Sequence, residues 1–148
     1  MTLSDKTGKQ MAAYQSGPFE DLTVQDALTI IAVFAAQMDP ENCADDVTRI
    51  GAIAENHPEF CETKGNILKR INKFVNSMLA AEDQQKALEI AKDALTPELL
   101  KTAFKLASEV ALPDKVLTEE KKTVLEILET KLSVDSEFSK KTIDKVIG

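Results

Sequence analysis

The sequence has no tryptophan, one tyrosine, one histidine and two cysteines among its 148 residues. One histidine and two cysteines are too few for a typical zinc site, and the cysteines do not form a Cys-x-x-Cys pair. The chain also lacks the glycine-rich loop that binds phosphate groups, which excludes the familiar routes of nucleotide hydrolysis. Because no catalytic motif is present, we predict that the chain is not an enzyme.

The single histidine leaves one catalytic alternative. His57 could act as the base for Cys43 or Cys61 in a nucleophilic dyad, but no third orienting group is evident. His57 also precedes Pro58 at the expected end of a helix, so a turn residue is the favoured interpretation. Since no apolar secretory signal precedes the two cysteines, we expect reduced thiols and a cytoplasmic protein.

Long hydrophobic runs are also missing. The longest run begins at Ala27 and has about ten residues, half of what a bilayer requires. Hydrophobic residues nevertheless make up 43% of the chain, and they recur at helical spacing without the alternation typical of strands. The sequence therefore predicts an all-α fold without a membrane span.

We expect a compact bundle of about seven helices. Residues 1–22 should form a partly helical N-terminal segment, and residues 23–148 a single all-helical domain. The expected helices cover residues 24–38, 44–56, 64–81, 87–95, 98–113, 118–132 and 136–147.

The most apolar segment of the chain is ALTIIAVFAAQMD, residues 27–39. The expected helix 24–38 that contains most of it has almost no polar stripe. A helix that is apolar on all sides must be surrounded by other elements, so we place it in the middle of the bundle. Thr23 and Asp26 precede it at the spacing of a capping box. Shifting the chain by 75 residues aligns this helix with residues 98–113, which predicts two related hairpins around two central apolar helices.

Charge is concentrated in one region of the chain. The net charge is −7, and residues 39–63 contain seven acids but only one basic residue, Arg49. Such a surface repels nucleic acid and anionic lipid, and it suits a cation or a basic protein surface. The following residues 64–73 carry four basic side chains, which we interpret as a solvated helix face.

The same shift aligns Asp39 with Asp114, and acids begin the next helix in both halves. The segment LASEVALPDKVLTEEKKTVLEILETKLSVD, residues 106–135, resembles the TerB-like family of tellurite-resistance proteins. The segment IIAVFAAQMDPENCADDVTRIGAI, residues 30–53, resembles it more weakly. The family has a glycine after the aspartate of its turn, where this chain has Pro40 and Lys115.

The resemblance implies two related helical halves, a cytoplasmic setting, and acids that hold a divalent cation. By position, its candidate metal ligands are Asp39, Asp46, Asp114 and Glu120. Clustered carboxylates suit Ca²⁺, Mg²⁺ or Mn²⁺, which prefer oxygen ligands. An EF-hand is excluded, because the loop that starts at Asp39 lacks the required glycine and glutamate.

Two interpretations of these acids stay open. Acidic residues at helix starts also stabilise a helix by capping and by opposing its dipole, without any ligand. The first hypothesis is a non-enzymatic protein of tellurite or metal-stress resistance that binds a divalent cation or a partner of the stress response. The alternative is a protein-interaction module whose acidic surface docks a basic partner without a metal.

Overall fold

The computed structural model describes residues 22–37, 43–57, 67–80 and 84–148, which form seven α-helices. The helices are α2 (Val24–Ala36), α3 (Cys43–Ala54), α4 (Ile67–Ala80), α5 (Gln84–Asp93), α6 (Pro97–Ala111), α7 (Glu119–Lys131) and α8 (Ser136–Ile147). No strand occurs in these ranges, so the predicted all-α fold is confirmed. Of the expected N-terminal segment, only Leu22 belongs to the described residues.

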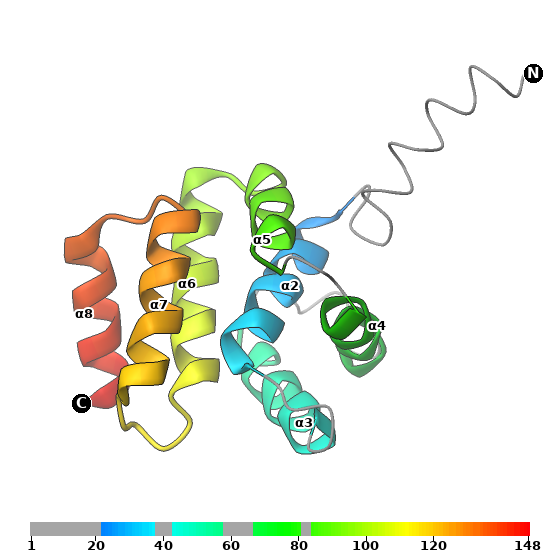
Figure 1. Cartoon of the computed structure of the whole chain (residues 1–148), viewed down its shortest axis with the longest axis horizontal. Coiled ribbons are helices and arrows are strands. Elements are labelled where there is room, and N and C mark those ends of the chain that lie inside the picture. Colours follow the sequence, from blue (N-terminus) through cyan, green and yellow to red (C-terminus); the bar gives the residue numbers. More distant parts are fainter. Residues whose placement is uncertain (1–21, 38–42, 58–66, 81–83) are drawn as a thin grey trace, which may run out of the picture.

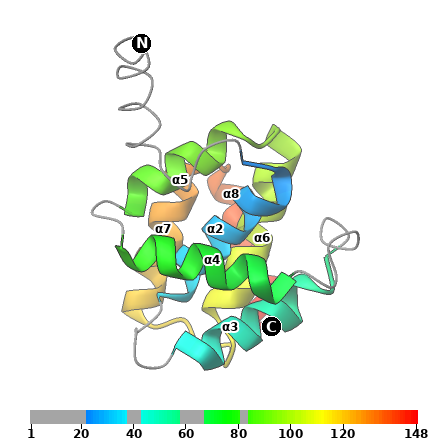
Figure 2. The same ribbon diagram turned by 90° about the vertical axis from the view of Figure 1, so that its right-hand side faces the viewer.

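Helix α2 occupies the centre of the structure. Figure 1 shows it between α6 on one side and the group of α3, α4 and α5 on the other, and Figure 2 shows α4 crossing in front of it. Its strongest packing is against α6, α4 and α5. All nine residues from 27 to 35 are buried, as expected for a helix without a polar stripe.

Helix α6 is the second central helix. It packs on α2, α3, α7 and α8, and Figure 1 shows it side by side with α7 and α8. Both central helices carry alanines that are at most 5% exposed: Ala27, Ala32 and Ala35 on α2, and Ala103, Ala107 and Ala111 on α6. Small buried side chains such as these let neighbouring helices approach closely.

The helix starts follow the predicted local signals. Thr23 Oγ1 accepts a hydrogen bond from the Asp26 amide, and Asp26 Oδ2 accepts one from the Thr23 amide, both at 3.1 Å. This capping box satisfies two amides that the first turn of α2 leaves free. Thr96 and Thr118 cap α6 and α7 with the hydroxyl alone, which accepts from the Leu99 amide and from the Lys121 amide.

The end of α2 differs from the prediction. We expected the helix to reach residue 38, but it ends at Ala36 because Gln37 adopts a left-handed conformation with φ of 48°. The Gln37 amide and its side-chain Nε2 both donate to the Phe34 carbonyl, at 3.1 and 2.7 Å. These bonds close the helix before the expected break at Asp39 and Pro40, which lie outside the described residues.

None of the helices in the described ranges is long and apolar enough to cross a bilayer.

Because α2 is central, a substitution that leaves a cavity beside it should strongly lower the free energy of unfolding. Leu28 is fully buried, so Leu28→Ala should lower the free energy of unfolding by about 2–5 kcal/mol. Leu117 is 38% exposed, and the matched change Leu117→Ala should lower it by less than about 1 kcal/mol. Urea unfolding followed by circular dichroism measures both values. Equal losses in the two variants would contradict the central placement of α2.

Candidate functional site

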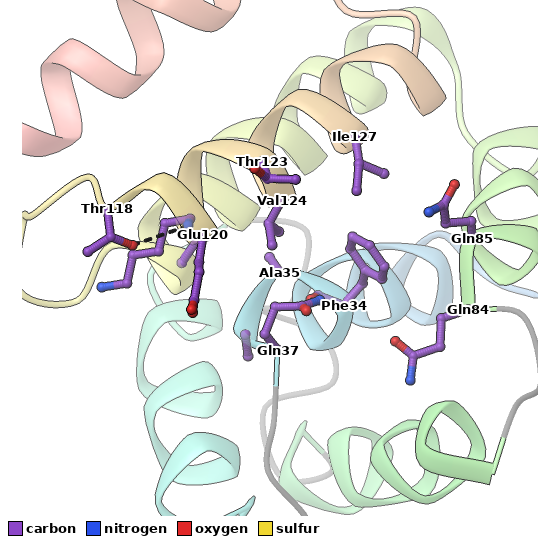
Figure 3. Close-up of a pocket in the computed structure, with 13 residues that line it drawn as sticks. Phe34, Ala35, Gln37, Gln84, Gln85, Thr118, Glu120, Thr123, Val124 and Ile127 are labelled. Atoms are coloured by element: carbon purple, nitrogen blue, oxygen red, sulfur yellow. Dashed lines mark hydrogen bonds between the residues drawn. The ribbon is translucent and has the colours of Figure 1, made fainter.

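A hollow of about 730 Å³ lies between the end of α2, the start of α5, the end of α6 and the first half of α7 (Figure 3). Its apolar side is formed by Phe34, Ala35, Val124 and Ile127. The two central helices thus contribute to one wall together with α7. A hollow of this size falls within the range of about 300–1,000 Å³ that is usual for ligand sites.

The polar side of the hollow is rich in amide and hydroxyl groups. Gln37 and Gln84 use Nε2 to donate to the Phe34 and Met78 carbonyls, at 2.7 and 2.9 Å. These bonds fix the two side chains at the edge of the hollow. Thr118 Oγ1 is occupied as the cap of α7, since it accepts from the Lys121 amide. The lining therefore combines an apolar wall with amide groups held in place by their own bonds.

Glu120 is the candidate metal ligand that lies in this hollow. It belongs to the first turn of α7, and its side chain is exposed at the edge of the hollow (Figure 3). Gln37 lies at the same edge and precedes Asp39 by two positions in the sequence. Asp39 itself lies outside the described residues.

Asp46 has a different environment on α3. Its Oδ1 accepts from Arg49 Nη1 at 2.6 Å, and Arg49 Nη2 donates to the Val110 carbonyl of α6 at 3.2 Å. The aspartate is thus part of a connection between α3 and α6. It does not line the hollow that contains Glu120.

Asp114 lies in the turn between α6 and α7. Its Oδ1 accepts from Lys121 Nζ at 3.0 Å and from the Val116 amide at 3.3 Å. The Lys121 hydrogen bond, followed by that of Val116, holds the pKa of the Asp114 carboxyl below its usual value. Lys115, the residue after it, has φ of 61°, a left-handed conformation that glycine adopts most easily.

The three candidate ligands that the structure describes, Asp46, Asp114 and Glu120, do not form one cluster. Within the ranges that the structure covers, no group of three or more His, Cys, Asp or Glu side chains could hold a metal ion. Asp46 forms an ion pair with Arg49, and Asp114 forms one with Lys121. Lys121 also lines the hollow next to Glu120. Of the four candidates, this leaves Glu120, and Asp39, which the structure does not describe.

Two interactions were not predicted from the sequence. His57 is buried, and its Nε2 lies 2.7 Å from Glu109 Oε1, so it connects the end of α3 to α6. Arg70 Nε donates to Asp26 Oδ1 at 2.9 Å. The interpretation of Arg70 as part of a solvated face was wrong, because its side chain is only 20% exposed. Each partner lies more than forty positions away, where local patterns carry no signal.

Comparisons of this chain with models of protein families, with curated proteins and with solved structures found no match. The fold and the hollow define an all-helical protein with two central helices and a mixed polar and apolar site beside them. The TerB-like assignment stays a prediction that rests on the quoted segments.

The ion pair in the α6–α7 turn predicts a pH effect. Lys121→Met removes the main donor to Asp114, so the Asp114 pKa should rise toward its usual value of about 3.9. Because folding lowers this pKa, the pair stabilises the fold above about pH 4, and this contribution is lost as the pH falls through the lowered pKa. Carboxyl NMR signals followed against pH measure the shift.

Lys122→Met serves as the matched control, because the neighbouring lysine does not bond to Asp114. An Asp114 pKa that is the same in the parent protein and in Lys121→Met would contradict the assignment.

Proposed function

We propose that this chain is a non-enzymatic binding protein, and that the hollow between α2, α5, α6 and α7 docks a basic segment of a partner protein. The observation that carries the proposal is the composition of the hollow. An apolar wall, two fixed glutamines and Glu120 lie together in a volume of about 730 Å³, and the lysine of the lining, Lys121, is paired with Asp114. Such a site accepts an apolar side chain next to a positive one.

The negative charge of the chain supports the proposal that its partner is basic. The chain has a net charge of −7, and Asp39, Glu41 and Asp45 follow α2 in the sequence. Glu120 adds a carboxylate at the edge of the hollow. Complementary charge speeds the encounter with a partner and selects against like-charged competitors.

The hollow also offers groups that suit a peptide. The Nε2 atoms of Gln37 and Gln84 already donate to carbonyls of the chain, so their side-chain oxygens are directed by those bonds. Amide oxygens accept hydrogen bonds from peptide N–H groups and from basic side chains. A partner segment would thus be oriented by polar groups and anchored by its apolar side chain.

The biological setting of the proposal comes from the resemblance. A TerB-like protein would act in the cytoplasm during tellurite or metal stress, and the docked protein would be a component of that response.

The docking proposal predicts a charge-sensitive interaction. Short peptides in which Leu or Phe is flanked by Lys and Arg, selected from a displayed library, should bind the protein. Glu120→Lys should weaken the best peptide by about tenfold, because it places like charges together. Binding should also weaken as the salt concentration rises from about 0.1 M to about 1 M, where charges are screened.

Glu126→Lys provides the matched control. Glu126 lies on the same helix but lines a different hollow, between α7 and α8, so its reversal should leave affinity nearly unchanged. Calorimetry gives the affinities, and NMR shift changes locate the peptide. Failure to select any peptide, or equal weakening by both reversals, would refute docking at this hollow.

A divalent cation is the second candidate ligand. It rests on the resemblance, which includes Asp39 and Glu120 among its candidate ligands, and on the exposed carboxylate of Glu120 at the edge of the hollow. A carboxylate from each half, completed by amide oxygens and water, would suit Ca²⁺, Mg²⁺ or Mn²⁺. Asp114 and Asp46 would contribute little to binding, because each already forms an ion pair with a basic side chain of the protein.

Calorimetric titration with Ca²⁺, Mg²⁺, Mn²⁺ and Zn²⁺ tests this candidate. Asp39→Asn and Glu120→Gln should each weaken binding by about tenfold or more, since each removes a charged oxygen ligand. Asp114→Asn should change affinity much less. No heat and no thermal shift with any of these metals would leave Asp39 and Glu120 without a role in cation binding.

A further inference from the structure

A second and larger surface feature lies on the other side of α6 from α2. It is a groove of about 910 Å³ lined by α3, the second half of α6, and α8. Both α3 and α8 pack on α6, so α6 forms the floor and the other two helices form the sides. Its apolar lining consists of Ile53, Leu112, Pro113, Phe138 and Val146.

The polar lining of this groove is strongly basic. Its charged residues include five cations, Arg49, Lys105, Lys115, Lys141 and Lys145. Glu109 is the acid among its lining residues, and it is paired with His57 at 2.7 Å. A protein with a net charge of −7 thus has a groove of the opposite sign.

Most of these cations lack a strong partner within the described ranges. Lys105, Lys115 and Lys145 form no ion pair with any residue that the structure describes. Lys141 Nζ lies 3.8 Å from Glu137 Oε1, but both side chains are 78% exposed. Such surface ion pairs contribute little to stability. The ammonium groups are therefore available to an incoming acidic surface.

The spacing of residues along α8 indicates the shape of the ligand. Phe138, Thr142 and Val146 follow one another at four-residue intervals and all line the groove, so they form one stripe along the helix. Lys141 and Lys145 run beside this stripe at the same interval. A helix lying along α8 could place apolar residues against the stripe and acids one turn apart against the two lysines.

We infer that this groove docks an amphipathic helix of a partner protein, with its apolar face on α6 and α8 and its acidic flank against the lysines. Helices bind in apolar grooves through residues at intervals of about three and four. This inference goes beyond the proposed function, because it concerns another surface and a partner of opposite charge.

The recessed apolar residues favour a helix over an anionic membrane surface. Leu112 is 2% exposed, and Phe138, Val146 and Ile53 are half-buried between the helices. Insertion into a bilayer requires apolar side chains that project outward on one face. A helix can instead place its own side chains into the groove.

A designed peptide tests the inference. It carries Leu at intervals of three and four residues and Glu on both flanks, with a fluorescent label for anisotropy measurements. The full-length protein should bind it, and NMR shift changes should map to α3, α6 and α8. The double variant Lys141→Glu and Lys145→Glu should weaken binding by about tenfold or more.

Lys140 supplies the matched control, because it neighbours Lys141 on α8 but lines the hollow between α7 and α8. Lys140→Glu should change affinity by less than about twofold. A second peptide with Lys in place of each Glu should bind the double variant better than the parent protein. Thermal unfolding confirms that the variants fold.

Several results would overturn the inference. These are absence of peptide binding, equal effects of Lys140→Glu and the double variant, or shift changes confined to the hollow beside α2. Vesicles containing phosphatidylglycerol form the last arm. If they bind the parent protein and lose binding in the double variant while the peptide does not bind, the groove recognises an anionic lipid surface instead.

Discussion

The structure depends on the enclosure of α2. Its residues 27–35 are buried without a break, so every side of this helix must be covered and the other helices take positions around it. Helix α6 covers one side, and α4 and α5 cover others. One face of α6 packs on α2, and α3, α7 and α8 pack on its remaining surface. The basic groove lies on this remaining surface, between α3, α6 and α8, and the first hollow lies where the end of α2 meets α5, α6 and α7.

The fold could be predicted because its signals are local. Thr23, Thr96 and Thr118 each precede a helix that they cap, and helical spacing of apolar residues identifies the buried faces. The end of α2 was misplaced by two residues, since Gln37 closes the helix with its own side chain. The pairs of Arg70 with Asp26 and of His57 with Glu109 were not predictable in this way. They depend on how helices far apart in the sequence meet.

The candidate site was predictable only in part for the same reason. The resemblance to the TerB-like family selected four acids by sequence position, but position alone does not reveal the partners of each side chain. Asp114 accepts from Lys121 and from the Val116 amide, and neither partner could be assigned from the position of the aspartate alone. Lys115, the residue after Asp114, has a left-handed conformation that glycine adopts most easily. The basic groove is lined by residues of α3, α6 and α8, so no single segment of the sequence predicts it.

The buried alanines of the two central helices limit what those positions tolerate. Ala27, Ala32, Ala103 and Ala107 are fully buried, and Ala35 and Ala111 are at most 5% exposed. Alanine has no rotamers to lose, so burying these side chains costs almost no side-chain entropy. A larger residue at any of these positions would need space in a packed interior, and the neighbouring helices would have to shift. Because Ala35 and Ala111 also line the hollow, an enlarged side chain at either position would change the shape of the site as well as the packing.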